Sequence, residues 1–231
     1  MNIAELDNPV WSALCGPHQT VAQREKDLAW YPSSIAPFAA IPSPRVVPDL
    51  ASAHGAGLVE PVYFVGACPQ WLPPPWRLLS TSQILQLFPS AESSRVRETA
   101  GTILGRTDRG AMRDLAQTAF PDFFRERTAE LGLYLGVYEG ERLIAMAGER
   151  LALEGLQEIS GVCTHPEFAR RGYARRLTHS LLEWHRQRGV GSFLHVSEGN
   201  AGARRLYRDM GFVERASLPL HMVGRAASEY A

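Results

Sequence analysis

Apolar and polar positions follow two different periods in the second half of the chain. Residues 111–120 form one helical stripe of apolar side chains, with Pro121 expected to end the helix; its members are Met112, Leu115, Ala116, Ala119 and Phe120. Residues 133–151 show alternating apolar runs on both sides of the turn "EGE", which indicates a β-hairpin. Residues 156–164 predict a third strand.

The following residues predict two helices and two strands. The first helix presents an apolar face and ends near Gly189; this face consists of Ala174, Leu177, Leu181 and Trp184. Residues 192–197 predict a strand, and residues 200–212 a helix with Asn200 as N-cap and Gly211 as its end. Residues 214–223 predict a closing strand. This order indicates a mixed α/β (α+β) fold with a central sheet flanked by helices.

The first part of the chain is rich in proline, since 13 of the 16 prolines in the whole chain precede residue 90. Proline interrupts helices and central strands, so short strands and irregular connections are expected. Residues 61–67 predict a buried strand, and residues 80–88 a short helix capped by Ser80 or Ser82. We place a boundary near residues 105–112, giving domains 1–108 and 109–231.

Composition narrows the class of protein. The 231 residues are 45% hydrophobic and 21% charged, with no formal net charge. This balance argues against a protein that coats nucleic acid, and no apolar run of about 18 residues predicts a membrane span. No signal peptide is expected at the start of the sequence. The cysteines are odd in number and widely spaced, at Cys15, Cys68 and Cys163. Their positions match neither a disulfide framework nor the spacing of zinc ligands, which suits the cytoplasm.

Two stretches carry candidate chemistry. In "ARRGYA", residues 169–174, a helix start offers unpaired N–H groups, Gly172 permits close approach, and Arg170 or Arg171 adds positive charge. This combination fits a pyrophosphate cradle, with a solvated basic helix turn as the alternative. In "NAGARRLYRDMGF", residues 200–212, Tyr207 either serves a site or simply packs with its hydroxyl reaching water.

Together these stretches resemble the GNAT acetyltransferases. That family's acetyl-CoA loop reads (Arg/Gln)-x-x-Gly-x-(Gly/Ala), and its later motif reads Asn-x-x-Ala-x-x-Leu-Tyr-x-x-x-Gly-Phe. The later motif is complete here, in Asn200, Ala203, Leu206, Tyr207, Gly211 and Phe212. The loop matches at Gly172 and Ala174 and departs at its first position, which is Ala169. The resemblance spans about residues 110–225, and proteins of this layout often carry a degenerate GNAT-like half ahead of it.

The resemblance implies a sheet splayed at the CoA-binding strand and a set of cofactor contacts. The pantetheine arm would pair with Val162, Cys163 and Thr164, and the N–H of Val162 would face the thioester oxygen. The pyrophosphate would lie on the loop formed by Arg170, Arg171, Gly172, Tyr173 and Ala174. Asn200 would cap its helix, with a contact to pantetheine as a further role.

The resemblance also implies catalytic roles. Tyr207 would give a proton to the departing thiolate. Glu158, fourteen residues before Gly172, is the leading general base, with a surface ion pair or a water chain as alternatives and Glu149 or Glu198 as weaker candidates.

Other titratable side chains are assigned structural positions. His165 contacts ligand phosphate or is an exposed loop residue, and His195 is an interior or face residue of a strand. His179 and His185 are expected in solvent, and the Cys163 side chain fills the core. Core positions are also favoured for Trp11, Trp71 and Trp76.

The expected function is transfer of an acetyl group from acetyl-CoA to a primary amine of a small molecule or peptide by direct attack. The alternative is a catalytically idle, acetyl-CoA-binding sensor or scaffold. The expected partners are acetyl-CoA and an amine acceptor, with no nucleic acid, no membrane and no metal. The oligomeric state is left open, a homodimer included. A nucleic-acid surface built on the arginine-rich helix starts is disfavoured by the zero net charge.

Overall fold

A large mixed sheet runs through the protein in the computed structural model, which describes residues 3–91, 93, 100–119 and 123–225. Its strand order is β4-β11-β5-β10-β9-β8-β7-β6, and a small second sheet has the order β1-β2-β3. The strands of the large sheet are β4 (Val62–Val65), β5 (Trp76–Pro89), β6 (Thr102–Ile103), β7 (Tyr134–Glu139), β8 (Arg142–Leu153), β9 (Leu156–Thr164), β10 (Gly191–Ser197) and β11 (Phe212–Arg225). Those of the small sheet are β1 (Gln23–Glu25), β2 (Leu28–Trp30) and β3 (Ala39–Ala40).

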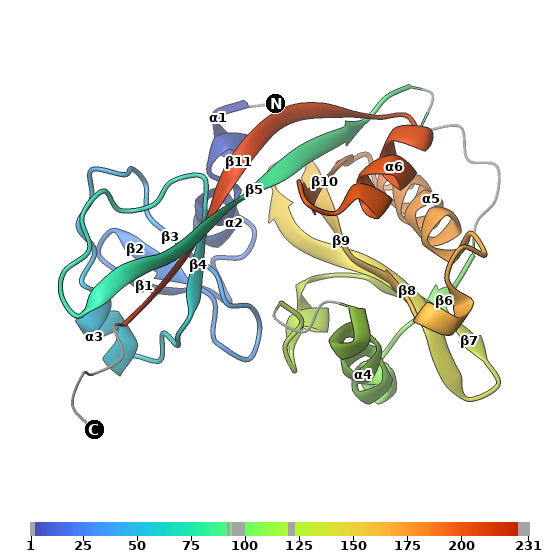
Figure 1. Cartoon of the computed structure of the whole chain (residues 1–231), viewed down its shortest axis with the longest axis horizontal. Helices are drawn as coiled ribbons and strands as arrows, with labels where there is room; N and C mark the ends of the chain where they lie inside the picture. Colours follow the sequence, from blue (N-terminus) through green and yellow to red (C-terminus); the bar gives the residue numbers. More distant parts are fainter. Residues whose placement is uncertain (1–2, 92, 94–99, 120–122, 226–231) are drawn as a thin grey trace.

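The helices cover the sheet on both faces. They are α1 (Ile3–Asp7), α2 (Pro9–Cys15), α3 (Leu50–Gly55), α4 (Arg109–Ala119), α5 (Tyr173–Gln187) and α6 (Ala201–Asp209), with 3-10 turns η1 (Arg106–Asp108), η2 (Thr128–Leu131) and η3 (Pro166–Phe168). Figure 1 shows the small sheet and α3 at one end of the molecule and α4, α5 and α6 at the other. On β8, Ala145 and Ala147 lie in one core cluster with α5, whereas Met146 lies in another cluster with α4. Successive strand residues point to opposite faces, so α4 and α5 lie on opposite sides of the sheet. Among the described residues, no helix is long and apolar enough to cross a membrane.

The expected fold class is confirmed, and so are most elements of the second half. The hairpin is formed by β7 and β8, and β9, α5, β10, α6 and β11 follow in the predicted order. Asn200 caps α6 by accepting a hydrogen bond from the N–H of Ala203 at 3.0 Å. Gly189 and Gly211 follow their helices with φ of 69° and 83°, in the left-handed region that favours glycine. The strand predicted at residues 61–67 is present as β4.

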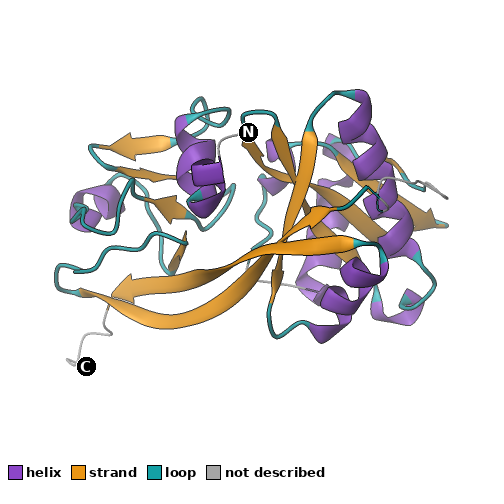
Figure 2. Ribbon diagram, turned by 90° about the horizontal axis from the view of Figure 1, so that it is seen from above, coloured by secondary structure: helices purple, strands orange, loops and turns teal. Residues whose placement is uncertain are grey.

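The helix predicted at residues 80–88 is wrong, because these residues belong to the long strand β5. Ile84 to Leu87 pair with β10 on one side, and β11 pairs along the whole of β5 on the other. Ser80 and Ser82 are exposed strand residues and cap nothing. Figures 1 and 2 show β5 and β11 running together from the small-sheet end toward the helices. Pairing on both edges supplies hydrogen bonds and burial that override the local helical pattern.

Several side chains on the predicted helices lie elsewhere than expected. His179 and His185 of α5 are buried rather than solvated, and Trp184 is 36% exposed. The buried stripe of α5 continues from Leu181 to His185, because His185 finds polar partners inside the protein. On α4, Ala119 is exposed, and the predicted Phe120 and Pro121 lie outside the described residues.

The tryptophans that were expected in the core also differ in their burial. Trp76 is buried, whereas Trp71 is 56% exposed, contrary to the expected core position. Trp71 lies in the proline-rich connection before β5, where the chain follows the surface.

The sheet splays between β9 and β10, as expected. These parallel strands pair only from Leu156 opposite Gly191 to Ile159 opposite Leu194. On its other edge, β9 shifts register against β8 just after Ser160, at Gly161, whose φ is 62°. A bulge of this kind bends one strand away from its neighbour, so Ser160–Thr164 diverges from β10.

The proposed division at residues 105–112 stays a prediction. β5 precedes it in sequence and lies between β10 and β11, both of which follow it. Residues on the two sides of this point therefore share one sheet.

Candidate active site

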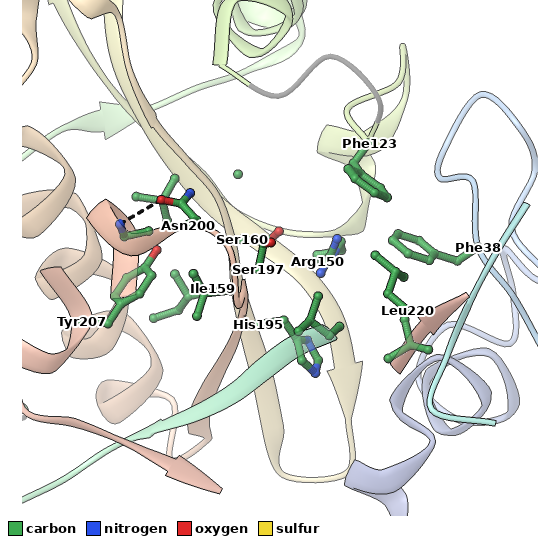
Figure 3. A pocket seen from close by; sticks show the side chains of 16 residues that line it. Phe38, Phe123, Arg150, Ile159, Ser160, His195, Ser197, Asn200, Tyr207 and Leu220 are labelled. Atoms are coloured by element: carbon green, nitrogen blue, oxygen red, sulfur yellow. Dashed lines mark hydrogen bonds between the residues drawn. The ribbon is translucent and has the colours of Figure 1, made fainter. Parts of the chain in front are cut away.

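A cavity of about 280 Å³ lies where β9 and β10 separate. Its lining comes from the diverging strands, from α6 and from the first part of the chain: Ile159, Ser160, Gly161, Val162, His195, Val196, Ser197, Asn200, Ala203, Tyr207, Phe38, Val65, Ile84, Phe123, Arg150 and Leu220. Figure 3 shows Tyr207 and Asn200 at one end of the cavity and Phe38 and Phe123 at the other, with Arg150 between Ser160 and Phe38. The cavity therefore has an α6 end and an aromatic end.

Tyr207 defines the α6 end. Its ring is buried against Phe212, and within the described part of the chain its hydroxyl has no protein hydrogen-bond partner. Burial raises the pKa of Tyr207 above its ordinary value of 10.0, so the phenol is protonated at neutral pH. The structure thus presents a hydrogen-bond donor at this end, in a water-poor setting.

The loop before α5 presents its backbone N–H groups. The N-cap is Gly172, with φ of 82° and no side-chain cap, and Arg170 also has a positive φ of 63°. Among the described residues, no N–H from Arg170 to Arg175 has a protein partner. Arg170 and Arg171 are exposed beside them. Consecutive free N–H groups at a helix start, with positive charge alongside, suit a phosphate group.

Glu158 lies behind the cavity wall and is completely buried. It accepts two hydrogen bonds from Arg150, at 2.9 and 2.6 Å, and one from the N–H of Leu151 at 3.2 Å. Burial alone would raise the pKa of Glu158, but Arg150 and His195 outweigh it and lower the pKa to about 2. A carboxylate so fully paired is a poor proton acceptor, and this environment argues against its expected role as the general base.

His195 connects Glu158 to the first part of the chain. Its Nδ1 lies 2.8 Å from Glu158, and its Nε2 lies 3.0 Å from the Gln86 amide. With Nδ1 protonated, His195 donates to the carboxylate and accepts from Gln86. Gln86 also donates to the carbonyl of Leu6 and accepts from Arg215. Segments far apart in sequence are therefore coupled by buried hydrogen bonds under the cavity.

Arg150 is the charged side chain that the sequence reasoning missed. Its Nε and Nη2 bind Glu158, and its guanidinium carbon lies 5.1 Å from the centroid of the Phe38 ring. Phe38 in turn stacks on Phe123, with centroids 5.8 Å apart. A usable signal was present, because Arg150 interrupts the apolar residues of a strand whose neighbour carries the buried Glu158.

The remaining candidates lie away from the cavity. Glu149 is buried and bonded to His185 and to the N–H of Leu133, and Glu198 is exposed. The Cys163 side chain packs in the core beneath α4, and burial raises its pKa to about 12, so its thiol stays protonated. The half-buried His165 contacts Arg142 and caps η3.

Comparison with known proteins concerns the fold and the family of the chain. The model of the FR47-like protein family matches residues 134–218. A solved structure from Novosphingobium aromaticivorans DSM 12444, assigned to the GNAT family of acetyltransferases, is 32% identical, with a TM-score of 0.81, and the match covers 96% of this chain and 99% of that one. No curated protein matches the chain in sequence.

Two more distant structures share the fold over nearly the whole chain. A GCN5-related N-acetyltransferase from Kribbella flavida is 16% identical with a TM-score of 0.57, covering 98% of this chain and 95% of that one. A GCN5-related N-acetyltransferase-like protein from Streptococcus suis is 13% identical with a TM-score of 0.57, covering 96% and 97%.

The fold and its splayed sheet are those of the GNAT family. The chain belongs to the GNAT family, on the strength of the full-length relative from N. aromaticivorans.

Proposed function

We propose that this protein transfers an acetyl group from acetyl-CoA to a primary amine of a small molecule or peptide by direct attack. The observation that carries the proposal is the cavity in the split between β9 and β10, which has a protonated, unpartnered Tyr207 hydroxyl at one end. That unpartnered state refers to the part of the chain that the structure describes.

Binding of acetyl-CoA would use the backbone of two neighbouring segments. The free N–H groups of Arg170 to Ala174 would hold the pyrophosphate, assisted by the exposed Arg170 and Arg171. The stretch Val162–Thr164, which no longer pairs with β10, would offer its backbone to the pantetheine arm. Ala169, where the family has Arg or Gln, leaves the backbone to supply most of this binding.

The chemical step joins the acceptor nitrogen to the acetyl carbon and breaks the carbon–sulfur bond. The nitrogen lone pair forms the amide bond, and the amine loses one proton. The Val162 N–H would stabilise negative charge developing on the thioester oxygen. Tyr207 would donate a hydrogen bond and then a proton to the departing thiolate, giving free CoA, and a proton from water would restore the phenol.

The proton lost by the amine needs an acceptor other than Glu158. The cavity is lined by the hydroxyls of Ser160 and Ser197, and Ser197 is exposed. We propose that water reaching these hydroxyls carries the proton to solvent. Glu158 then acts indirectly, by fixing the positions of Arg150 and His195.

The test is release of free CoA from acetyl-CoA by the purified protein with a broad panel of amines, followed with a thiol reagent. Tyr207→Phe is expected to lower kcat by about 10²–10⁴ while the dissociation constant for CoA stays unchanged. Gly172→Leu is the matched variant in the loop; with φ of 82°, a leucine there is strained, and CoA binding should be lost.

The same experiment distinguishes the acetyltransferase from the alternative, a catalytically idle sensor that only binds acetyl-CoA. Locked Glu158 and the Ala169 departure favour that alternative. Acetyl-CoA binding without CoA release for any amine would establish it and exclude the enzyme.

A further inference from the structure

The aromatic end of the cavity gives information about the acceptor. Under the proposed function, the thioester lies at the α6 end, beside Tyr207, and the acceptor must enter from the opposite side. That side is formed by Phe38, Val65 and Phe123 together with Leu220. All four residues lie outside residues 134–218, the segment that matches the family model. The acceptor wall therefore depends on parts of the chain beyond that segment.

Arg150 is the charged group on this wall. Two of its three guanidinium nitrogens bind Glu158, and, among the described residues, its Nη1 has no protein partner. Its side chain keeps 17% of its surface exposed, and it lines the cavity. Nη1 carries only N–H donors, so the complementary ligand group is an acceptor oxygen.

Among the lining residues that the structure describes, no carboxylate lies alongside Arg150. Glu158 is covered completely and is saturated by its own partners. A second ammonium, as in a polyamine or a lysine-rich peptide, would meet the positive charge of Arg150 without a carboxylate from the described lining residues. A carboxylate would accept charge-assisted hydrogen bonds from the free N–H groups of Arg150.

The rest of the wall is apolar and aromatic. The stacked Phe38 and Phe123 are joined by Tyr63, whose ring centroid lies 4.9 Å from that of Phe123. A cavity of about 280 Å³ is also small for a macromolecular acceptor. Figure 3 shows both phenylalanine rings close to Arg150, so an oxygen bound there would lie next to the apolar wall.

We infer that the acceptor is an amino acid with a bulky apolar, preferably aromatic, side chain, whose carboxylate binds Arg150 and whose ring packs on Phe38 and Phe123. The inference rests on the proposed function for the direction of entry, and its ligand class follows from the lining alone.

Four amines test it, with free CoA as the readout: L-phenylalanine, phenethylamine without the carboxylate, L-alanine without the ring, and spermidine. We expect kcat/KM for L-phenylalanine to exceed each of the others by about tenfold or more. A higher value for phenethylamine or spermidine would overturn the inference.

Variants test the two contacts separately. Arg150→Gln combined with Glu158→Gln removes the ion pair without leaving a buried charge, and should raise KM for L-phenylalanine about tenfold or more while that for phenethylamine stays unchanged. Phe38→Leu should raise KM for L-phenylalanine and for phenethylamine alike. Arg113→Gln, on the exposed face of α4, is the control. Equal effects of the double variant on both amines would contradict the carboxylate contact.

Calorimetry of L-phenylalanine with the CoA-bound protein separates this inference from the proposed function. Binding of L-phenylalanine, with no CoA released from acetyl-CoA for any amine of the panel, would support the ligand class and refute the acetyl transfer. If L-phenylalanine is neither bound nor acetylated, the inferred ligand class is overturned, whatever other amine is acetylated.

Discussion

At the scale of single residues, Arg150, Glu158 and His195 show how burial changes the role of a charged group. Glu158 sits at the sequence spacing of a catalytic base, yet its two oxygens are taken by Arg150, His195 and the N–H of Leu151. Removing either member of a buried ion pair leaves an uncompensated charge and is strongly destabilising. The pair therefore fixes the cavity wall, and Arg150 keeps one nitrogen for a ligand.

This environment predicts a pH-dependent stability. The pKa of Glu158 falls from an ordinary 4.5 to about 2 on folding, so the unfolded chain binds the proton more readily. The contribution is complete above about pH 4.5 and is lost as pH falls toward about 2; it amounts to a few kcal/mol. Urea unfolding at stepped pH should show this loss in the native protein.

The Arg150→Gln and Glu158→Gln double variant should show a flatter profile between about pH 4.5 and 2, because the titrating carboxylate is gone. Glu183→Gln, which removes the surface partner of Arg186, should keep the native slope, since exposed pairs add little. An unchanged slope in the double variant would show that other carboxylates cause the acid sensitivity.

At the scale of elements, β5 is the strand that organises the site. It pairs with β10 just before the splay, and its Ile84 lines the cavity. Its Gln86 is fully buried and bonds His195 of β10. Residues 80–88 were predicted as a helix because hydroxyl residues precede an apolar run, but the strand is set by two partners distant in sequence.

The strand assignment makes a prediction about Ser80 and Ser82. As helix caps, either serine would contribute about 1 kcal/mol to folding. As exposed residues of β5 they should contribute little, so Ser80→Ala and Ser82→Ala should each change the free energy of unfolding by less than about 0.5 kcal/mol. Urea denaturation measures this directly.

Asn200→Ala is the matched control for that measurement, because Asn200 does cap α6. It should cost about 1 kcal/mol. A loss of similar size for either serine variant would speak against the strand.

At the scale of the whole molecule, the two parts of the sequence form one sheet. β5 separates β10 from β11, and the first part also supplies Phe38 and Val65 to the cavity. Asp7 and Arg215 form an ion pair between the two ends of the chain at 2.6 Å. The family resemblance covers residues 110–225, but the site it implies is enclosed by residues outside that range.

The sheet therefore predicts how a fragment behaves. A fragment of residues 109–231 would expose the edge of β10 and leave β11 without its main partner. We expect it to lack a cooperative thermal transition by circular dichroism, whereas the full chain unfolds cooperatively, because unpaired edges and lost core contacts remove its stability. A cooperatively folded fragment that binds CoA would instead support an independent domain at residues 109–231.

The sequence by itself determined the elements from residue 109 onward and their family. Helical and strand periods there are local and long, and the Asn200–Phe212 motif combines a cap, a buried face and a glycine end in one helix. Such features need only neighbouring residues to be recognised. The loop at Gly172 was found in the same way, from a glycine at a helix start.

Only the tertiary structure decided what surrounds the cavity. The partners of β5, the pairing of Arg150 with Glu158 and the stacking of Phe38 on Phe123 all join residues brought together by the fold. A carboxylate's pKa depends on burial and on which charges approach it, and neither is encoded in its sequence spacing. For that reason the loop at Gly172 and the Asn200–Phe212 motif could be recognised in the sequence, whereas the residues around the cavity and the buried environment of Glu158 required the folded chain.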